Sequence, residues 1–361
     1  MKRTYIIAEA GVNHNGSMEL AKSLIDVALE AGADAIKFQL FKAKALATLS
    51  SKKASYQIEA TKNSESQFEM LQKLELDVDQ QLLLKSYATQ KGIEFLSTPF
   101  DIASLESLAK KFNISRLKIS SGDLTNAPLL LAAARTALPL ILSTGMASLS
   151  EIEQALGVIA YGLIAKCSEK PSMSHFHLSY QSEEGSKALK ERVTLLHCTT
   201  EYPAPLNEVN LNVMETLRRC FDLEVGYSDH TAGIHIPIAA VAMGATMIEK
   251  HFTLDRNMDG PDHKASLEPN ELKEMVKNIR DVEMAKGSSI KKPTQSELKN
   301  KGIARRSIIA TKKITKGEIF TPENLDVKRP ESGLSPILYW DLLGKVADKN
   351  FEEDEVITAL C

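Results

Sequence analysis

The sequence predicts a (β/α)₈ TIM barrel followed by a small β-rich domain. Short apolar runs rich in β-branched residues recur through residues 1–285, and a helical pattern follows each run. Eight such runs can be counted, which is the strand number of this barrel. Polar and charged residues follow nearly every run. This distribution favours a closed barrel over a doubly wound open sheet, in which reactive groups gather at one switch point.

The predicted strands are short, and each ends where polar or small residues begin. Eight β-then-α units of this kind favour a parallel sheet covered by helices. The runs are Tyr5–Ala8, Ala35–Phe38, Glu94–Leu96, Arg116–Ile119, Leu138–Leu142, Val193–Leu196, Glu224–Gly226 and Met247–Ile248.

Several helices carry their own start signals. Ser148 and Glu151 have the spacing of a capping box, in which each side chain satisfies a free backbone N–H of the first turn. Asp79 and Asp101 are predicted N-caps, and the helix that begins at Asp101 is expected to extend to Phe112.

The barrel pattern ends near Ala285. The polar segment 286–302 is expected to be a linker, and residues 303–361, with short strands such as Ser307–Ala310 between Gly and Pro turns, are expected to form the β-rich domain. Residues 286–329 contain twelve Lys or Arg and four Asp or Glu, although the whole chain has a net charge of −3. Such a basic arm either contacts an anion or forms a solvated face.

Composition excludes several classes of protein. Hydrophobic content of 43% and charged content of 25% are ordinary globular values. No run approaches the roughly 18 apolar residues of a membrane span, and the N-terminus lacks the apolar core of a secretory signal. We therefore expect a cytoplasmic protein with no membrane or nucleic-acid partner. The cysteines, which form no CxxC pair and are expected to be reduced, are Cys167, Cys198, Cys220 and Cys361.

The residues that follow the strands are rich in charge, hydroxyl and imidazole. A barrel brings the carboxyl ends of its strands around one mouth, so these side chains are expected to line one cavity. They are Glu9, Asn13 and His14; Lys37 and Gln39; Ser97, Thr98 and Phe100; Lys118 and Ser121; Ser143 and Thr144; Thr200 and Tyr202; Ser228, Asp229 and His230; Lys250 and His251.

Two of these residues are lysines inside apolar strands. Burying an unpaired ammonium group is costly, so Lys37 and Lys118 need a reason to lie there. One reason is a structural ion pair with Glu9 or Glu249. The other is a phosphorylated substrate that bears a carboxylate, and two lysines at equivalent strand ends favour this reading.

Two histidines follow consecutive strands. His230 and His251 are expected to converge on a divalent metal, although either one alone is more often a satisfied polar residue. Such an open site would act as a Lewis acid on a carbonyl. Glu9 is a candidate for orienting water or handling a proton. Asp262 and His263 either contact a hydroxylated substrate or hold their own loop.

Long motifs in this chain resemble those of the bacterial sialic acid synthase family. The resemblance extends from Tyr5 to about Asp354. The tail from Ile303, with KGEIFTPENL and KRP, resembles the antifreeze-like (SAF) domain that this family carries behind its barrel. The other motifs are EAGVNHNG, IKFQ, LSTPFD, STGM, HCTTEYPAP, GYSDHTAG, IEKHFTLD, GPDHKASLEP and ARRSIIA.

The resemblance implies a transferase that condenses phosphoenolpyruvate with an N-acetylmannosamine-type sugar. It implies that His230 and His251 hold Mn²⁺, with Mg²⁺ or Co²⁺ as alternatives, and that Glu9 positions a water molecule. We also assign Phe100 and Thr200 to the substrate site. The other implied contacts are Lys37, Thr98, Lys118, Ser121, Ser143 and Ser228 for phosphoenolpyruvate, and Gln39, Tyr202 and Asp262 for the sugar.

The resemblance also implies a domain-swapped homodimer, in which the SAF domain covers the partner's barrel mouth and delivers an arginine. By motif this arginine is Arg306, which would give the basic arm a function. Three features depart from the family pattern. Segment Cys167–Lys190 is longer than the usual connection, SGD at Ser121–Asp123 replaces SGE, and Thr200 stands where some relatives have asparagine.

The acceptor sugar stays open. N-acetylmannosamine would give N-acetylneuraminate, and 2,4-diacetamido-2,4,6-trideoxymannose would give N,N′-diacetyllegionaminate; a few loop residues could discriminate between them. Other readings are an octulosonate-type synthase acting on a phosphorylated sugar, a metal-dependent pyruvate aldolase, and a carbohydrate-binding protein without activity.

Overall fold

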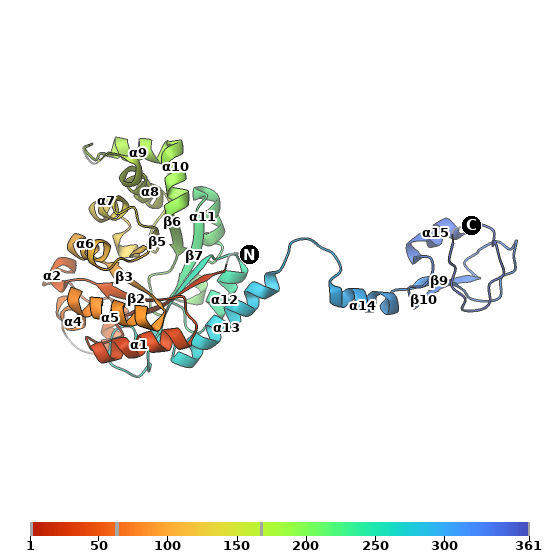
Figure 1. The fold of residues 1–361 in the computed structure, drawn as a ribbon, viewed down its shortest axis with the longest axis horizontal. Coiled ribbons are helices and arrows are strands. Elements are labelled where there is room, and N and C mark those ends of the chain that lie inside the picture. Colours follow the sequence, from red (N-terminus) through yellow and green to blue (C-terminus); the bar gives the residue numbers. More distant parts are fainter. Residues whose placement is uncertain (1–2, 62–64, 167–168, 360–361) are drawn as a thin grey trace. The chain divides into compact units, whose positions relative to one another are not determined.

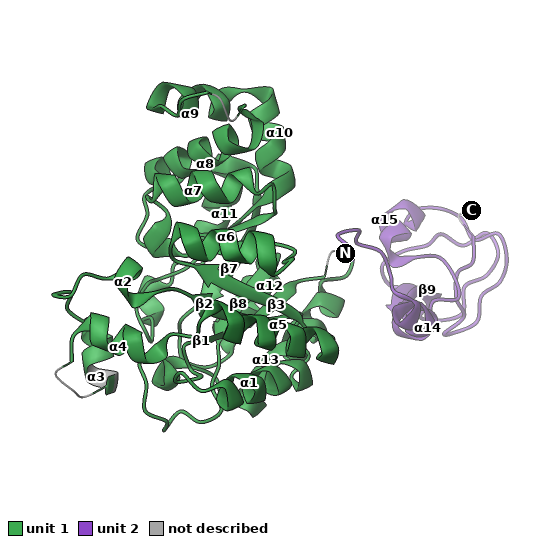
Figure 2. Cartoon of the chain, turned by 60° about the vertical axis from the view of Figure 1, so that its left-hand side comes forward, with its two compact units in different colours: residues 1–287 green, residues 288–361 purple. Residues whose placement is uncertain are grey.

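The computed structural model describes residues 3–61, 65–166 and 169–359 (Figure 1). The chain forms two compact units, residues 1–287 and 288–361 (Figure 2). Among the described residues, no helix is long and apolar enough to cross a membrane.

In the first unit, eight parallel strands form one sheet that curls into a nearly closed barrel (Figure 1). Neighbouring strands follow the order β3, β2, β1, β8, β7, β6, β5, β4, and β3 contacts β4. The predicted barrel is confirmed. The strands are β1 Tyr5–Gly11, β2 Ala35–Leu40, β3 Glu94–Pro99, β4 Leu117–Ile119, β5 Leu140–Ser143, β6 Val193–His197, β7 Glu224–Asp229 and β8 Met247–His251.

Several strands extend beyond their predicted ends. Strand β7, for example, continues past Gly226 to Asp229. Polar residues normally mark a turn. At this end of the barrel, however, the polar side chains belong to the strands themselves and face either a cavity or a buried ion pair, so they do not end the strands.

The helices of the first unit surround the barrel (Figure 1). They are α1 Met18–Glu30, α2 Ala43–Leu46, α3 Ser55–Thr61, α4 Gln67–Leu74, α5 Val78–Lys91, α6 Ile102–Lys111, α7 Ala127–Arg135, α8 Leu149–Ile164, α9 Met173–Gln181, α10 Glu183–Arg192, α11 Val213–Phe221, α12 His235–Ala242 and α13 Pro269–Lys286. Ser148 begins α8 with the predicted capping box, and Asp101 caps α6. The cap predicted at Asp79 is wrong, because Asp77 accepts from the backbone N–H of Gln80 and caps α5.

Apolar side chains fill the barrel interior beneath the strand ends. A Cβ atom on Gly226 would lie 2.5 Å from the carbonyl oxygen of Met247 and 2.7 Å from Leu196 Cδ2. The interior is therefore packed closely enough to exclude a methyl group at this point. The buried interior cluster is Ile7, Ala35, Leu96, Ile141, Leu196 and Met247.

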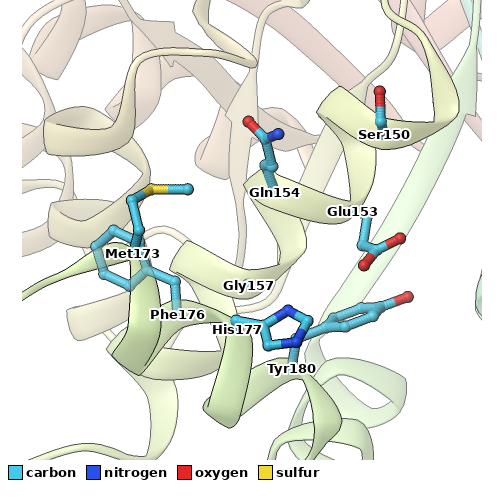
Figure 3. A pocket seen from close by; sticks show the side chains of 8 residues that line it. All are labelled: Ser150, Glu153, Gln154, Gly157, Met173, Phe176, His177 and Tyr180. Atoms are coloured by element: carbon cyan, nitrogen blue, oxygen red, sulfur yellow. The ribbon is translucent and has the colours of Figure 1, made fainter.

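The long connection that begins at Cys167 contains helices α9 and α10, which follow α8; Cys167 itself lies outside the described residues. Helix α9 crosses α8 closely, because a Cβ on Gly157 would lie 3.1 Å from the carbonyl oxygen of Phe176. Between these two helices lies a hollow of about 250 Å³, shown in Figure 3. Its acidic and imidazole side chains, Glu153 and His177, are exposed.

The second unit is a small β-rich fold with its own core. Helix α14 (Gln295–Ala304) lies largely in the segment expected to be a linker. A capping box formed by Thr294 and Glu297 starts this helix. Strands β9 (Ser307–Ala310) and β10 (Leu325–Lys328) pair antiparallel, and helix α15 (Tyr339–Leu342) follows. The buried core is Ile308, Ala310, Ile314, Phe320, Leu325, Leu342, Ala347, Phe351 and Ile357.

We expect Gly226→Ala to destabilise the barrel by about 1–3 kcal/mol, because the added methyl group meets backbone and side-chain atoms that cannot move apart freely. Urea unfolding measures the change. In the control Gly302→Ala, on α14, no atom lies within 4 Å of the added methyl. The control variant should be as stable as the wild type or more stable by about 0.5–1 kcal/mol, since alanine favours a helix. Equal unfolding of Gly226→Ala and the wild type would contradict close packing at this position.

Candidate active site

The carboxyl ends of the strands surround a polar cavity of about 390 Å³. Strand register brings its charged groups together, since Glu9 on β1 pairs with Lys37 on β2 and with His251 on β8. Arg306 belongs to the second unit. The other site residues implied by the family resemblance, together with Phe100 and Thr200, all line this cavity: Glu9, Lys37, Gln39, Thr98, Phe100, Lys118, Ser121, Ser143, Thr200, Tyr202, Ser228, His230, His251 and Asp262.

The expectation that every polar residue at a strand end faces this cavity is wrong. Side chains alternate between the two faces of a strand, so alternate residues point outward toward the helices. Ser97 thus donates to Gln81 (2.8 Å), and Asp229 pairs with Lys250. His263, in the loop after β8, contacts the hydroxyl of Thr253 instead. The strand-end residues that do not line the cavity are Asn13, His14, Ser97, Thr144, Asp229 and Lys250.

A network of buried charges occupies the floor of the cavity. Lys37 Nζ lies 2.8 Å from Glu9 Oε2 and 3.5 Å from Glu249 Oε2. Lys118 Nζ lies 3.4 Å from Glu249 Oε1 and donates to Ser143 (2.7 Å). Glu249 therefore joins the two lysines. Sequence reasoning considered it only as an ion-pair alternative, although its place two residues before His251 on one strand indicated the same face.

The network sets the protonation of its members. Burial raises the pKa of Glu9 to about 7 against the opposing charge of Lys37, and the negative charge of Glu249 adds to the rise. Burial also disfavours the charge of Glu249, but Lys118 and Lys37 lower its pKa to about 2. Burial lowers the pKa of Lys118, whereas the two carboxylates raise that of Lys37 despite its burial. Burial and the neighbouring carboxylate thus favour a proton on Glu9, whereas the two lysines favour the anionic form of Glu249.

The two histidines lie next to each other at the ends of β7 and β8. Their ring centroids are 5.6 Å apart, and the Tyr202 ring lies 4.2 Å from that of His230. Burial lowers the pKa of both imidazoles, so both are neutral near pH 7. Nδ1 of His230 contacts the carbonyl oxygen of Thr199 at 2.6 Å. Donation from this atom leaves the lone pair of Nε2, which lies 3.5 Å from Ser228 Oγ, to bind a cation.

Neutral, buried imidazoles fit a divalent transition metal. Within the described part of the chain, Nδ1 of His251 is buried without a hydrogen-bond partner, and Asp262 Oδ2 lies 3.9 Å from it. The described residues contain no group of three or more histidine, cysteine or acidic ligands. His230 and His251 are thus the two groups at this point of the cavity that could hold such an ion.

Neutral donors line another side of the cavity. Ser121 Oγ accepts from the backbone N–H of Gly145 (3.0 Å) and lies 3.1 Å from Cys198 Sγ. A Cβ on Gly145 would lie 2.5 Å from Thr200 Oγ1, so this approach requires glycine. Asp123, the shorter acid of the SGD motif, accepts from Ser120 and does not line the cavity.

Two family models cover most of the chain. The model described as the NeuB family matches residues 24–291, and the SAF domain model matches residues 305–360. The chain belongs to the NeuB family. The N,N′-diacetyllegionaminic acid synthase of Campylobacter jejuni is 52% identical over 99% of both chains. That of Legionella pneumophila is 44% identical over 96% of this chain and 91% of its own.

A solved structure is also similar to this chain. The N-acetylneuraminic acid synthetase of Leptospira borgpetersenii, crystallised with citrate, superposes with a TM-score of 0.65. It is 35% identical, over 82% of this chain and 90% of that one.

Sequence reasoning missed one wall of the cavity in this NeuB-family chain. Helices α3 and α4 contribute Tyr56, Gln57, Gln67, Met70 and Leu71 to the lining. The Tyr56 ring lies 4.9 Å from that of Tyr202, which links the wall to the histidines. The long segment between β2 and α5 was the available signal, because extended βα loops of a barrel lie at its active-site face.

The raised pKa of Glu9 predicts how stability depends on pH. The folded, metal-free protein holds this proton to about pH 7, whereas the ordinary value is 4.5. The stability that the protonated Glu9 adds to the folded state is therefore fully present below pH 4.5 and is lost as pH rises through about 7. From pH 5 to pH 8 the wild type should lose up to about 3 kcal/mol relative to Glu9→Gln, which has no proton to lose. Urea unfolding of both proteins measures this, and an identical pH dependence would contradict it.

Proposed function

We propose that this NeuB-family chain condenses phosphoenolpyruvate with an N-acetylmannosamine-type sugar, giving a nine-carbon α-keto acid and phosphate. One observation carries the proposal: two buried lysines, two buried carboxylates and two buried imidazoles converge in one cavity. The similarity to legionaminic and N-acetylneuraminic acid synthases supports it.

The lysines bind phosphoenolpyruvate. Its phosphate and carboxylate carry several negative charges, and Lys37 and Lys118 offer ammonium groups held at fixed positions by Glu249. Thr98, which accepts from Lys37 at 3.2 Å, and Ser143 add hydroxyl donors. Point charges combined with neutral donors suit an anion that bears both groups.

His230 and His251 hold the divalent cation, for which we take Mn²⁺ as the first choice, with Mg²⁺ or Co²⁺ as alternatives. When bound, this cation supplies Lewis acidity to the sugar's carbonyl oxygen. Tyr202, whose ring lies against that of His230 at a tilt of 33°, keeps the imidazole in place.

In the overall reaction, C3 of phosphoenolpyruvate forms a bond to the sugar's aldehyde carbon, water adds at C2, and the C2–O bond to phosphate breaks. Glu9 takes the proton of that water, because its pKa of about 7 makes it the one carboxyl of the network that exchanges a proton near neutrality. Lys37, 2.8 Å from Glu9, offsets the negative charge that leaves with phosphate.

The acceptor we favour is 2,4-diacetamido-2,4,6-trideoxymannose, which gives N,N′-diacetyllegionaminate. The relatives named for this product support the choice. The wall from α4 adds Met70 and Leu71 to the cavity, and an apolar wall suits the methyl carbon of a 6-deoxy sugar better than a hydroxymethyl group. Gln39 and Asp262 provide polar contacts for the acetamido and hydroxyl groups.

The full enzyme in this proposal is a domain-swapped homodimer in the cytoplasm. Each SAF domain would then deliver Arg306 to the sugar bound by the partner. The family match over residues 305–360 and the exposed Arg306 side chain support this arrangement.

Phosphate release tests the function. With phosphoenolpyruvate and Mn²⁺, the purified protein should release phosphate with 2,4-diacetamido-2,4,6-trideoxymannose at a kcat/KM about 10-fold or more above that with N-acetylmannosamine. Excess chelator should abolish release, and Mn²⁺ should restore it. Arabinose 5-phosphate tests the octulosonate-type alternative, and pyruvate tests the aldolase. No release with either amino sugar, or faster release with the phosphorylated sugar, would overturn the proposal.

We expect Glu9→Gln to lower kcat by about 100-fold or more, because the amide cannot accept a proton from water. Phosphoenolpyruvate affinity should stay within about threefold of the wild type, since both lysines remain. Steady-state kinetics and calorimetric titration measure the two quantities. The exposed pair partner of Lys110 provides the control Glu106→Gln, which should leave both unchanged. Full turnover by Glu9→Gln would remove Glu9 from the mechanism.

A further inference from the structure

A second ion pair lies directly behind the two histidines and contributes nothing to the cavity lining. Asp229 and Lys250 pair at 2.5 Å, and both side chains are 0% exposed. Asp229 immediately precedes His230, and Lys250 immediately precedes His251. Because side chains alternate along a strand, the pair faces outward while the histidines face the cavity.

Thr231 closes this pair into a triangle. Its backbone N–H and hydroxyl donate to the Asp229 carboxylate at 3.0 and 3.1 Å. Lys250 Nζ donates to the same carboxylate and to the carbonyl oxygen of Thr231. The residues on both sides of His230 are thus tied to the residue before His251.

A buried ion pair is weak evidence for stability. Removing two charges from water costs about as much as their attraction returns, and apolar replacements are often as stable. The pair does, however, constrain how β7 and β8 align. Asp229 and Lys250 are the last paired residues of the β7–β8 ladder, after Ser228 and Glu249. Any slip of one strand past the other would leave two buried charges unpaired, which is strongly unfavourable.

We propose that the lock formed by Asp229, Thr231 and Lys250 is a positioning device that fixes His230 and His251 at matching heights, so that both reach one divalent cation. The inference rests on the metal site of the proposed function. The lock contacts neither substrate nor cavity. It acts through the backbone on both sides of His230 and through the residue before His251, while the carbonyl oxygen of Thr199 orients the His230 ring.

Metal affinity without substrates tests the lock. The double variant Asp229→Asn/Lys250→Met removes both charges together and so avoids an unpaired one. Its Mn²⁺ dissociation constant, from electron paramagnetic resonance of free Mn²⁺, should rise about 10-fold or more, the range typical of groups that orient metal ligands. The matched control Asp34→Asn/Arg280→Met removes a half-buried ion pair that does not line the cavity. Its affinity should stay within twofold of the wild type.

The outcomes separate the two claims. A wild type that binds no Mn²⁺ and releases no phosphate overturns the proposed function. A wild type that binds Mn²⁺, with a double variant within twofold of it, overturns the lock alone. If the double variant does not fold, Thr231→Val decides, because it keeps both charges and the side-chain shape. It should weaken Mn²⁺ binding about threefold or more, whereas the control variant should keep wild-type affinity even if its thermal unfolding temperature falls equally. An unchanged affinity of Thr231→Val overturns the lock.

Discussion

Two lysine ammonium groups at the mouth of a barrel keep their charge only if carboxylates share the same buried space. Here Glu249 contacts both lysines, and Glu9 contacts one. The residues come from β1, β2, β4 and β8, which meet because the sheet closes. The network thus keeps two cations fixed and ready for an anionic substrate, and a small displacement of any one strand would leave a buried charge unpaired.

The need to pair buried charges also divides the polar residues of β7 and β8 between two faces. Ser228 and Glu249 point inward to the lysines, whereas Asp229 and Lys250 point outward and tie the strands together. Inward residues are free to meet a substrate because outward residues hold the backbone. Strand alternation therefore lets neighbouring residues perform unrelated tasks at one end of the barrel.

Additions to the barrel occupy different environments. Helices α3 and α4 follow β2 and bring side chains to the cavity, where Tyr56 contacts Tyr202. Helices α9 and α10 follow α8 and pack against it (Figure 1). An insertion between a strand and its helix reaches the mouth of a barrel. The first insertion lines the cavity, whereas α9 packs along the first half of α8 and does not line it.

Strand periodicity in the sequence was enough to predict the barrel and half of the residues that line the cavity, because this periodicity is local and the reactive residues follow the strands. It could not determine which strand-end residues face inward, and so Asp229 and Lys250 were grouped with the cavity. Nor could it identify Glu249 as the shared partner of both lysines, or Tyr56 as part of the wall. Those facts depend on strand register, on the exact end of each strand and on the path of a long loop. The closed barrel alone decides them, since it brings together residues far apart in the chain.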